Sequence, residues 1–177
     1  MDATVEGRGP VVVGFDGSAP AEDAVRFAID EGGRRGASVR VVVAHEPPDA
    51  WMTSYGYPLL ADTGEIRQAV EDGARTRVEE IRAGLGAAER AVPVEVVAVT
   101  GPAGWVLTQE AEGAAMLVVG HRGRGGLRST LFGSVGLSVV LRAPCPVTVV
   151  RPTPAPAHEA HEQDAAVAGP LPVGPIA

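Results

Sequence analysis

The sequence contains no lysine, so all fifteen of its basic residues are arginines. This absence excludes a P-loop lysine, a Schiff-base lysine and the strand lysine of a protein kinase. Only one cysteine is present, Cys145, which cannot form a disulfide within the chain and therefore suits a reducing cytosol. Because Cys145 stands between two prolines, we expect it to be a small packed residue rather than a redox centre.

Excess positive charge and long apolar runs are also lacking. The net charge of −7 argues against a protein built to coat nucleic acid or an anionic membrane. No apolar run approaches the roughly 20 residues of a membrane span, and the polar start MDATVEGRGP gives no sign of a signal peptide. We therefore expect one cytoplasmic domain at 10–151, with a flexible lead at 1–9 and a disordered Pro/Ala-rich tail at 152–177.

Short apolar runs alternate with segments of helical spacing. The apolar runs predict buried strands at 11–15, 39–44, 94–99, 116–119 and 147–150. The helical segments follow Ser18, cover 66–85, follow Pro102 and begin at Ser134, and the first is expected to end near Gly32 and Gly33. This order predicts an α/β fold, a doubly wound parallel sheet with helices on both faces. Its ligand site is expected at the carboxyl ends of the strands, where the strand order reverses.

Other features allow more than one interpretation. The irregular segment 46–63 contains Trp51, Tyr55 and Tyr57, which either cover a ligand or pack back onto the domain as a flap. Trp105, in the short third helix, is expected in the core. His158 and His161 have a spacing that a metal can use, but two histidines in a mobile tail make a poor site.

The segment from Met116 to Arg142 combines a strand, a glycine loop and a helix. Its spacing is G-2x-G-9x-G-S, formed by Gly120, Gly123, Gly133 and Ser134. Glycine permits close backbone approach and dihedral angles that other residues avoid, and a helix N-terminus adds unpaired donors. Three arginines bring full charges to the loop: Arg122, Arg124 and Arg128. The segment is therefore predicted to hold an anion such as a phosphate group.

Three blocks of the sequence resemble the universal stress protein family (the UspA-like domain), in its ATP-binding branch. They are VVVGFDGS at Val11–Ser18, the glycine signature at Gly120–Ser134, and APCPVTVVR at Ala143–Arg151. The resemblance covers about residues 10–151 and implies a Rossmann-like, five-stranded sheet in the order 3-2-1-4-5. In that order Asp16 and Gly120 face the same crevice. The resemblance also implies a stress-response module that binds ATP and forms a homodimer through the strand Val147–Val150.

The resemblance assigns a role to individual residues. The turn after the first strand borders the nucleotide through Gly14, Phe15 and Asp16, with Asp16 near the ribose or a nucleotide-bound Mg. Val119 and Gly120 flank the adenine and ribose, and the phosphates lie at Gly123, Arg124, Gly133, Ser134 and Val135. No structural metal is implied. Asp16 has a second interpretation, as the acceptor of an Asx turn, and both roles are compatible.

The chain departs from the family at the end of the second strand. The family tends to place a small apolar residue against the adenine, but here that position is His45, or Ala44 if the alignment shifts by one residue. An imidazole can stack on a purine or hydrogen-bond to it, and it can also crowd the pocket. His121, inside the signature, is expected to be an exposed loop residue.

Three functions remain open at this point. A nucleotide-binding signalling module is favoured, because the sequence offers no lysine, no Ser-His-Asp pattern and no paired carboxylates for catalysis. A slow ATPase is the first alternative, since a metal together with Asp16 can orient water. The second alternative is a structural dimer that binds no nucleotide, against which the intact glycine spacing argues. The apolar strand 147–150 is expected to pair with its copy, unless the tail folds back over it.

Overall fold

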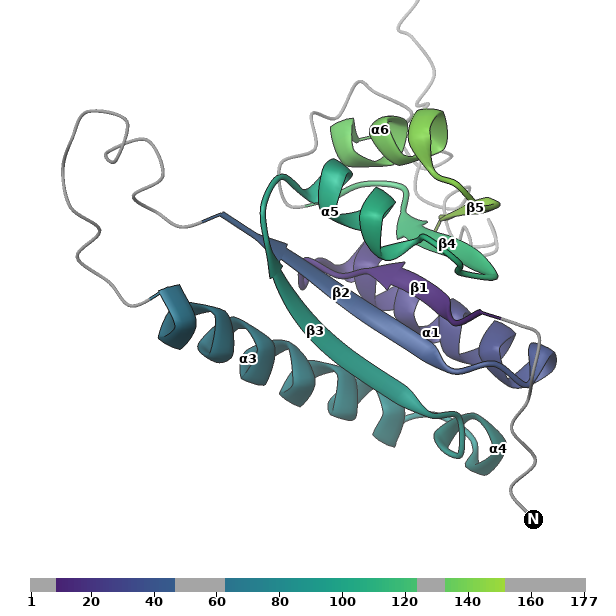
Figure 1. The fold of residues 1–177 in the computed structure, drawn as a ribbon. Coiled ribbons are helices and arrows are strands. Elements are labelled where there is room, and N and C mark those ends of the chain that lie inside the picture. The colour runs from purple at the N-terminus through teal and green to yellow at the C-terminus, as the bar shows by residue number, and fades with distance from the viewer. Residues whose placement is uncertain (1–8, 47–62, 124–132, 152–177) are drawn as a thin grey trace, which may run out of the picture.

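The computed structural model describes residues 9–46, 63–123 and 133–151 (Figure 1). The strands are β1 Val11–Gly14, β2 Val39–His45, β3 Val94–Thr100, β4 Met116–Gly120 and β5 Val147–Val150. The helices are α1 Ala19–Arg35, α3 Thr63–Ala83, α4 Ala87–Arg90, α5 Ala103–Glu110 and α6 Ser134–Arg142. The predicted tail, nearly all of the predicted lead and most of the irregular segment 46–63 lie outside the described residues.

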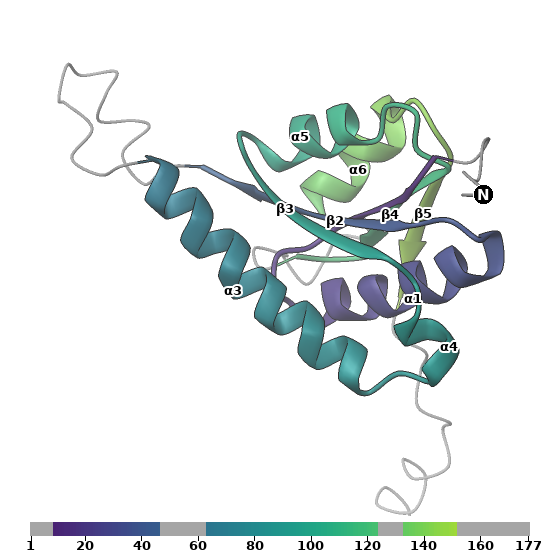
Figure 2. The ribbon, with the colours of Figure 1, turned by 60° about the horizontal axis from the view of Figure 1, so that its bottom comes forward.

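The strands form one parallel sheet in the order β3-β2-β1-β4-β5, as predicted. β1 lies at the centre, where Val11 is opposite Val39 of β2 on one side and Met116 of β4 on the other. Helices α1, α3 and α4 cover one face of the sheet, and α5 and α6 cover the other (Figure 2). The two faces arise because right-handed crossovers run outward from β1 in opposite directions.

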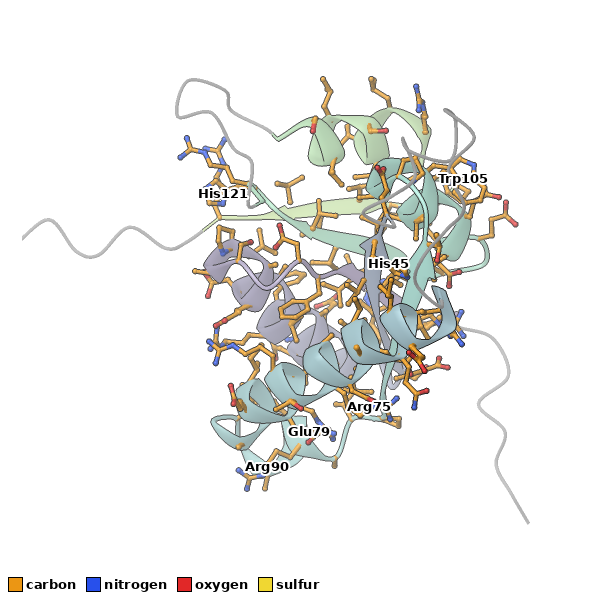
Figure 3. All side chains as sticks on the ribbon, turned by 90° about the vertical axis from the view of Figure 1, so that its left-hand side faces the viewer. His45, Arg75, Glu79, Arg90, Trp105 and His121 are labelled. Carbon is orange, nitrogen blue, oxygen red and sulfur yellow. The ribbon has the colours of Figure 1, made fainter. Side chains whose placement is uncertain are left out.

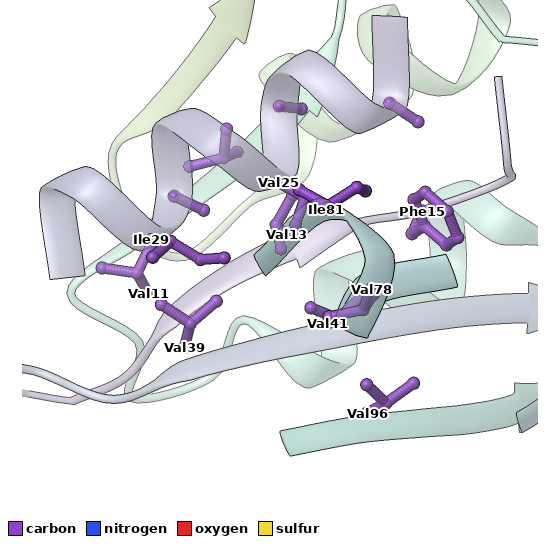
Figure 4. Packing of buried hydrophobic residues seen from close by; sticks show 14 of the residues in the cluster. Val11, Val13, Phe15, Val25, Ile29, Val39, Val41, Val78, Ile81 and Val96 are labelled. Atoms are coloured by element: carbon purple, nitrogen blue, oxygen red, sulfur yellow. The ribbon is translucent and has the colours of Figure 1, made fainter. Parts of the chain in front are cut away.

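The central strand is apolar throughout because both of its faces are buried. Val11 and Val13 pack toward α1 and α3, where they meet Val25 and Ile29 (Figure 4). Val12 points the other way, into the cluster beneath α5 and α6. The continuous apolar run that predicted this strand therefore reflects its position between two helical layers.

The first helix is longer than the sequence suggested. We expected α1 to end near Gly32 and Gly33, but it continues to Arg35 and is terminated by Gly36, whose φ of 64° is left-handed. Gly32 is needed for packing, since a Cβ there would lie 2.8 Å from Val39 Cγ2. The short helix α4 was not predicted.

The expectation that Trp105 lies in the core is wrong. Val106 and Leu107 of α5 are buried against the sheet, whereas Trp105 exposes 56% of its surface. Cys145, by contrast, is half-buried beside the α5–α6 cluster, and burial raises the pKa of its thiol. Within the described ranges, no helix combines the length and apolarity needed to cross a membrane.

Candidate functional site

The candidate site lies at the carboxyl ends of β1 and β4, which are neighbours in the sheet although they are far apart in sequence. The strand order reverses between these two strands, which is where ligands bind in doubly wound sheets. Figure 3 labels His45, which ends β2, and His121, which follows β4. Two turns meet at this place, one after β1 and one after β4.

The turn after β1 is held by Asp16. Its Oδ1 accepts hydrogen bonds from the Ser18 backbone amide, at 3.0 Å, and from the Ser18 hydroxyl, at 2.6 Å. Gly17 between them has a φ of 77°, which favours glycine. Ser18 is the N-cap residue of α1, but its hydroxyl bonds to Asp16 and not to the helix. The Asx-turn role predicted for Asp16 is therefore confirmed.

Gly123 brings the second turn against the first. A Cβ on Gly123 would lie 2.6 Å from Asp16 Oδ2, so a side chain at this position would have to displace the Asp16 carboxylate. The base of the glycine loop is closed by a hydrogen bond from the Gly133 amide to the His121 carbonyl, at 3.3 Å. At Gly133 an added Cβ would make only ordinary contacts with the described residues, at 3.9 Å from Arg122 Cα and Gly123 N. Gly123 thus lies against Asp16, and a side chain at Gly133 meets no clash among the described residues.

Gly120 allows the end of β4 to pack closely against α1. A Cβ at this position would lie 2.7 Å from the carbonyl oxygen of Pro20 in the first turn of α1. The end of β4 and the start of α1 therefore approach each other through the backbone.

Positive charge and backbone donors gather near Gly133. Gly133 is the N-cap of α6, and exposed Ser134 is its first residue. The first amides of a helix have no partner within it, and its N-terminus carries a partial positive charge. Arg122 is half-buried, and its buried Nε has no hydrogen-bond partner among the described residues. Such a donor favours an incoming acceptor such as a phosphate oxygen. Arg124, also predicted for this role, lies outside the described residues.

Several predicted site residues turn their side chains into the core. Phe15 and Val119 are buried, and Val135 packs against the cluster beneath α5 and α6. Gly14 lies against Leu107, where a Cβ would be 2.9 Å from Cδ1. At the crevice itself, Phe15 and Val119 can contribute only backbone atoms.

The expectation that His121 is an exposed loop residue is wrong. His121 is half-buried, and its amide donates to the Val150 carbonyl at 2.8 Å, which continues the pairing of β4 with β5. Its carbonyl accepts the bond that closes the glycine loop. The spacing of the signature leaves this position unconstrained, so this structural role could not be predicted from the sequence.

His45 lies one strand away from the β1–β4 crevice. It is the last residue of β2, opposite Thr100 of β3, and its Nε2 lies 3.1 Å from the Thr100 hydroxyl oxygen. Ala44 packs toward α5 and α6, so the two candidates for the adenine position face opposite sides of the sheet.

Two other places in the described structure are hollowed. Two surface hollows of about 450 and 470 Å³ lie along α3 and β3, lined mainly by charged side chains such as Glu71 and Arg75. Within the described ranges, no group of three or more histidine, cysteine or acidic residues is arranged to hold a metal ion. Hydrogen bonds to Glu80 and Glu22 raise the pKa of Arg77. Arg77 belongs to α3 and not to the turns that follow β1 and β4.

Fold and site together define a doubly wound α/β domain with glycine-containing turns at the point where its strand order reverses. The chain belongs to the universal stress protein family, whose model matches residues 7–151.

Relatives of known sequence support this membership. A universal stress protein of Mycolicibacterium smegmatis is 39% identical over 153 residues, which are 85% of this chain and 48% of that protein. One from Mycobacterium tuberculosis is 37% identical over 142 residues, covering 80% of this chain and 45% of that protein. The chain thus spans about half the length of the curated relatives it matches.

Solved structures agree with the fold. A universal stress protein in complex with cAMP superposes with a TM-score of 0.55 at 26% identity, covering 81% of this chain and 97% of that chain. The universal stress protein of Archaeoglobus fulgidus in complex with dAMP gives 0.53 at 25% identity, covering 81% and 98%. UspA of Lactobacillus plantarum, at 19% identity, shares the fold with a TM-score of 0.61 and coverage of 82% and 99%.

Proposed function

We propose that the domain at 10–151 binds an adenine nucleotide, ATP in the first place, and acts as a cytoplasmic binding module in stress signalling. The observation that carries this proposal is the position of Gly123 against Asp16, with the N-terminus of α6 beginning at Gly133 and the buried Nε of Arg122 without a partner among the described residues. The two solved relatives that hold cAMP and dAMP support the choice of an adenine nucleotide.

In this proposal the phosphates lie over the loop from Gly123 to Ser134. The helix N-terminus and the Ser134 hydroxyl donate to phosphate oxygens, and Arg122, together with Arg124, neutralises their charge. Asp16 lies at the ribose, or at a Mg ion carried in by the nucleotide. Its carboxylate already accepts from Ser18 through Oδ1, so the Asx turn also fixes its orientation.

The base would lie along the carboxyl ends of β4, β1 and β2. There Gly14, Phe15, Val119 and Gly120 offer backbone groups, and His45 supplies a ring that its contact with Thr100 holds in place. An imidazole at this position can stack on the purine or hydrogen-bond to it.

A competition experiment tests the nucleotide class. The purified chain is incubated with equal amounts of ATP, ADP, cAMP, GTP and CTP, passed through a desalting column and denatured, and the released nucleotides are identified by mass. We expect adenine nucleotides to be retained by the native chain and lost by Gly133→Val. Retention of none, or of guanine and cytosine nucleotides equally, would contradict the proposal.

The same experiment separates binding from turnover. A binding module returns ATP unhydrolysed after hours of incubation, whereas an ATPase returns ADP. If ADP is recovered from the native chain but not from a protein with Asp16 substituted, the domain is a slow ATPase and not only a binding module.

We also propose that the domain forms a homodimer through β5. This strand is at one end of the sheet, and all four of its residues are only partly buried. An apolar edge strand is a template for pairing, and a two-fold axis beside it would join two copies antiparallel. Light scattering on the full chain and on a protein ending at Arg151 should give a dimer in both cases.

The outcomes distinguish pairing from a covered edge. A full-length monomer that dimerises only after truncation would show that residues 152–177 cover β5. A monomer in both proteins at micromolar concentration would rule out the β5 interface.

A further inference from the structure

Four large apolar side chains of the described residues are exposed, and all four lie on α5 and α6. Trp105 of α5 exposes 56% of its surface, and on α6 Leu137 exposes 53%, Val140 50% and Leu141 74%. The two helices cover the same face of the sheet, and Figure 3 shows Trp105 at the periphery of the molecule. We call these four residues the α5–α6 patch. Exposed apolar residues that gather in one place mark interaction sites, whereas those scattered singly do not.

The members of the patch lie close together. The three on α6 are three and four residues apart, so they share one face of that helix. α6 touches α5 where a Cβ on Gly104 would lie 2.6 Å from the hydroxyl oxygen of Ser138. Trp105 follows Gly104 directly, and Leu137 directly precedes Ser138. The patch therefore lies on both sides of one close helix contact.

The patch is an uncharged surface on an acidic molecule. α5 and α6 each carry one charged residue, Glu110 and Arg142, and each stands at the last position of its helix. The helices on the opposite face carry many ion pairs, such as Arg77–Glu22 between α3 and α1. Burying a charge without a partner is costly, so the patch favours an occupant that is both apolar and uncharged.

The sequence that follows β5 contains a segment with this chemistry. Residues 165–177, AAVAGPLPVGPIA, have no charged side chain, whereas the preceding residues 152–164 include Glu159, Glu162 and Asp164. The polar first half of the tail has the composition of a linker. The apolar second half has the composition that the patch favours.

Prolines restrict the conformations open to this second half. Every second or third residue from Pro170 to Pro175 is a proline, which fixes φ near −65° and favours a polyproline II helix of three residues per turn. In that conformation Pro170, Val173 and Ile176 share one face. Surfaces that present aromatic rings bind such segments, and the entropy lost is small because the conformation is set beforehand. Trp105 supplies the ring, and the exposed face of α6 supplies apolar surface beside it.

The chain connects this segment directly to the layer that carries the patch. β5 ends at Val150, and Val135 of α6 packs with Val147 of β5 against the same apolar cluster. A flexible linker of roughly 20 residues, the number between Arg151 and Pro170, spans about 25 Å on average. α6, with its 9 residues, is only about 13 Å long. A tether of this kind gives an effective concentration near the millimolar range, so even a weak contact forms.

From these features we infer that residues 165–177 bind the α5–α6 patch of their own chain. The patch is then an intramolecular docking site for an uncharged, proline-rich segment, with residues 152–164 as the connection. The tail is favoured over a separate protein because it matches the patch in charge and is covalently attached. This contact leaves β5 free, since the patch lies on a face of the domain and β5 lies at the edge of the sheet.

Tryptophan fluorescence tests this contact. In a Trp51→Phe protein, Trp105 is the remaining tryptophan. Its emission should lie at shorter wavelength than in the same protein ending at Arg151, because the bound tail removes water from the ring. A synthetic peptide of residues 165–177, added to the truncated protein, should restore the shorter wavelength. In the full chain the emission should not depend on protein concentration, because the contact forms within one molecule.

Two double variants of the Trp51→Phe protein locate the contact in the tail. Val173→Asp with Ile176→Asp places two charges in the segment proposed to bind. Ala155→Asp with Ala157→Asp places the same charges in the connection and is the matched control. We expect the first variant to have the emission of the truncated protein, and the second to keep the emission of the full-length protein.

Other occupants of the patch give different results. Identical Trp105 emission in the full-length and truncated proteins would overturn the inference. A move to shorter wavelength that appears only as protein concentration rises would assign the patch to a second copy instead. Equal emission from the two double variants would show that residues 165–177 make no specific contact. A tail that covers β5 would change the mass from light scattering and leave Trp105 emission unchanged.

Discussion

Gly120 and Gly133 belong to one sequence signature but differ in what surrounds them. An added Cβ at Gly120 would lie 2.7 Å from the carbonyl oxygen of Pro20, whereas at Gly133 nothing lies within 3.9 Å. Gly120→Ala should therefore destabilise the fold by about 1–3 kcal/mol, as overpacking does. This corresponds to a fall in Tm of roughly 2–10 °C, measured by thermal unfolding.

Gly133→Val is the complementary variant. Its cost to folding is limited to a weaker N-cap, about 1 kcal/mol or less. Its side chains fill the space proposed for the phosphates, so ATP affinity should fall at least tenfold, about 1.4 kcal/mol. A large loss of stability in Gly133→Val, or its absence in Gly120→Ala, would show that we have assigned the two roles wrongly.

The positions of the signature glycines could be predicted from the sequence, but the reason why glycine is needed there was predicted wrongly in part. We expected dihedral angles that other residues avoid, but the positive φ values among the described glycines belong to Gly17, Gly36, Gly101 and Gly113. Gly120 and Gly123 are required by close approach to Pro20 and Asp16. The spacing of glycines along a chain does not show which residue of another segment each glycine approaches.

The two outer strands, β3 and β5, differ in whether a side chain covers the backbone groups of their outer edges. At β3 the amide of Ala98 donates to Glu71 Oε2 on α3, at 3.4 Å, so a charged side chain occupies a backbone donor of that edge. At β5, Leu117 donates to the Pro146 carbonyl and His121 to the Val150 carbonyl. Because pairing alternates along a parallel strand, the amides of Val147 and Val149 face outward. We therefore expect association through β5 and not through β3.

Val149→Pro tests this expectation. Proline removes the outward amide and leaves the groups that pair with β4 in place. We expect the mass from light scattering to fall by about a factor of two. Val149→Thr keeps the amide and the branched side chain, and should keep the mass of the native protein. Unchanged mass in Val149→Pro, with a native circular dichroism spectrum, would exclude β5 as the interface.

The strands and the sheet order were predictable because strands buried on both faces produce continuous apolar runs. Two helical details were not predictable. Trp105, Val106 and Leu107 are three consecutive apolar residues, and the contact of Gly104 with Ser138 helps decide which of them faces outward. α4 is a single turn, too short to show a repeating apolar face. Its one sequence signal is Glu89, whose side chain accepts a capping hydrogen bond from the Gly86 amide.

For the molecule as a whole, the charge distribution predicts how binding responds to salt. The net charge is −7, yet the glycine loop contains Arg122, Arg124 and Arg128. Attraction between these arginines and phosphate is screened over about 8 Å at physiological ionic strength, so ATP affinity should fall as salt rises. Titrations at low and high salt measure this effect. Neutralising all three arginines without loss of affinity at low salt would show that they are solvated loop charges.

The central claim is that an adenine nucleotide binds where β1 and β4 end. Calorimetric titration of ATP into the nucleotide-free full chain, with Gly133→Val as its partner measurement, tests this most directly. The account predicts saturable binding of one ATP per chain, and an affinity at least tenfold lower in Gly133→Val at nearly unchanged Tm. No binding by the native chain, or equal affinity in both proteins, would contradict it.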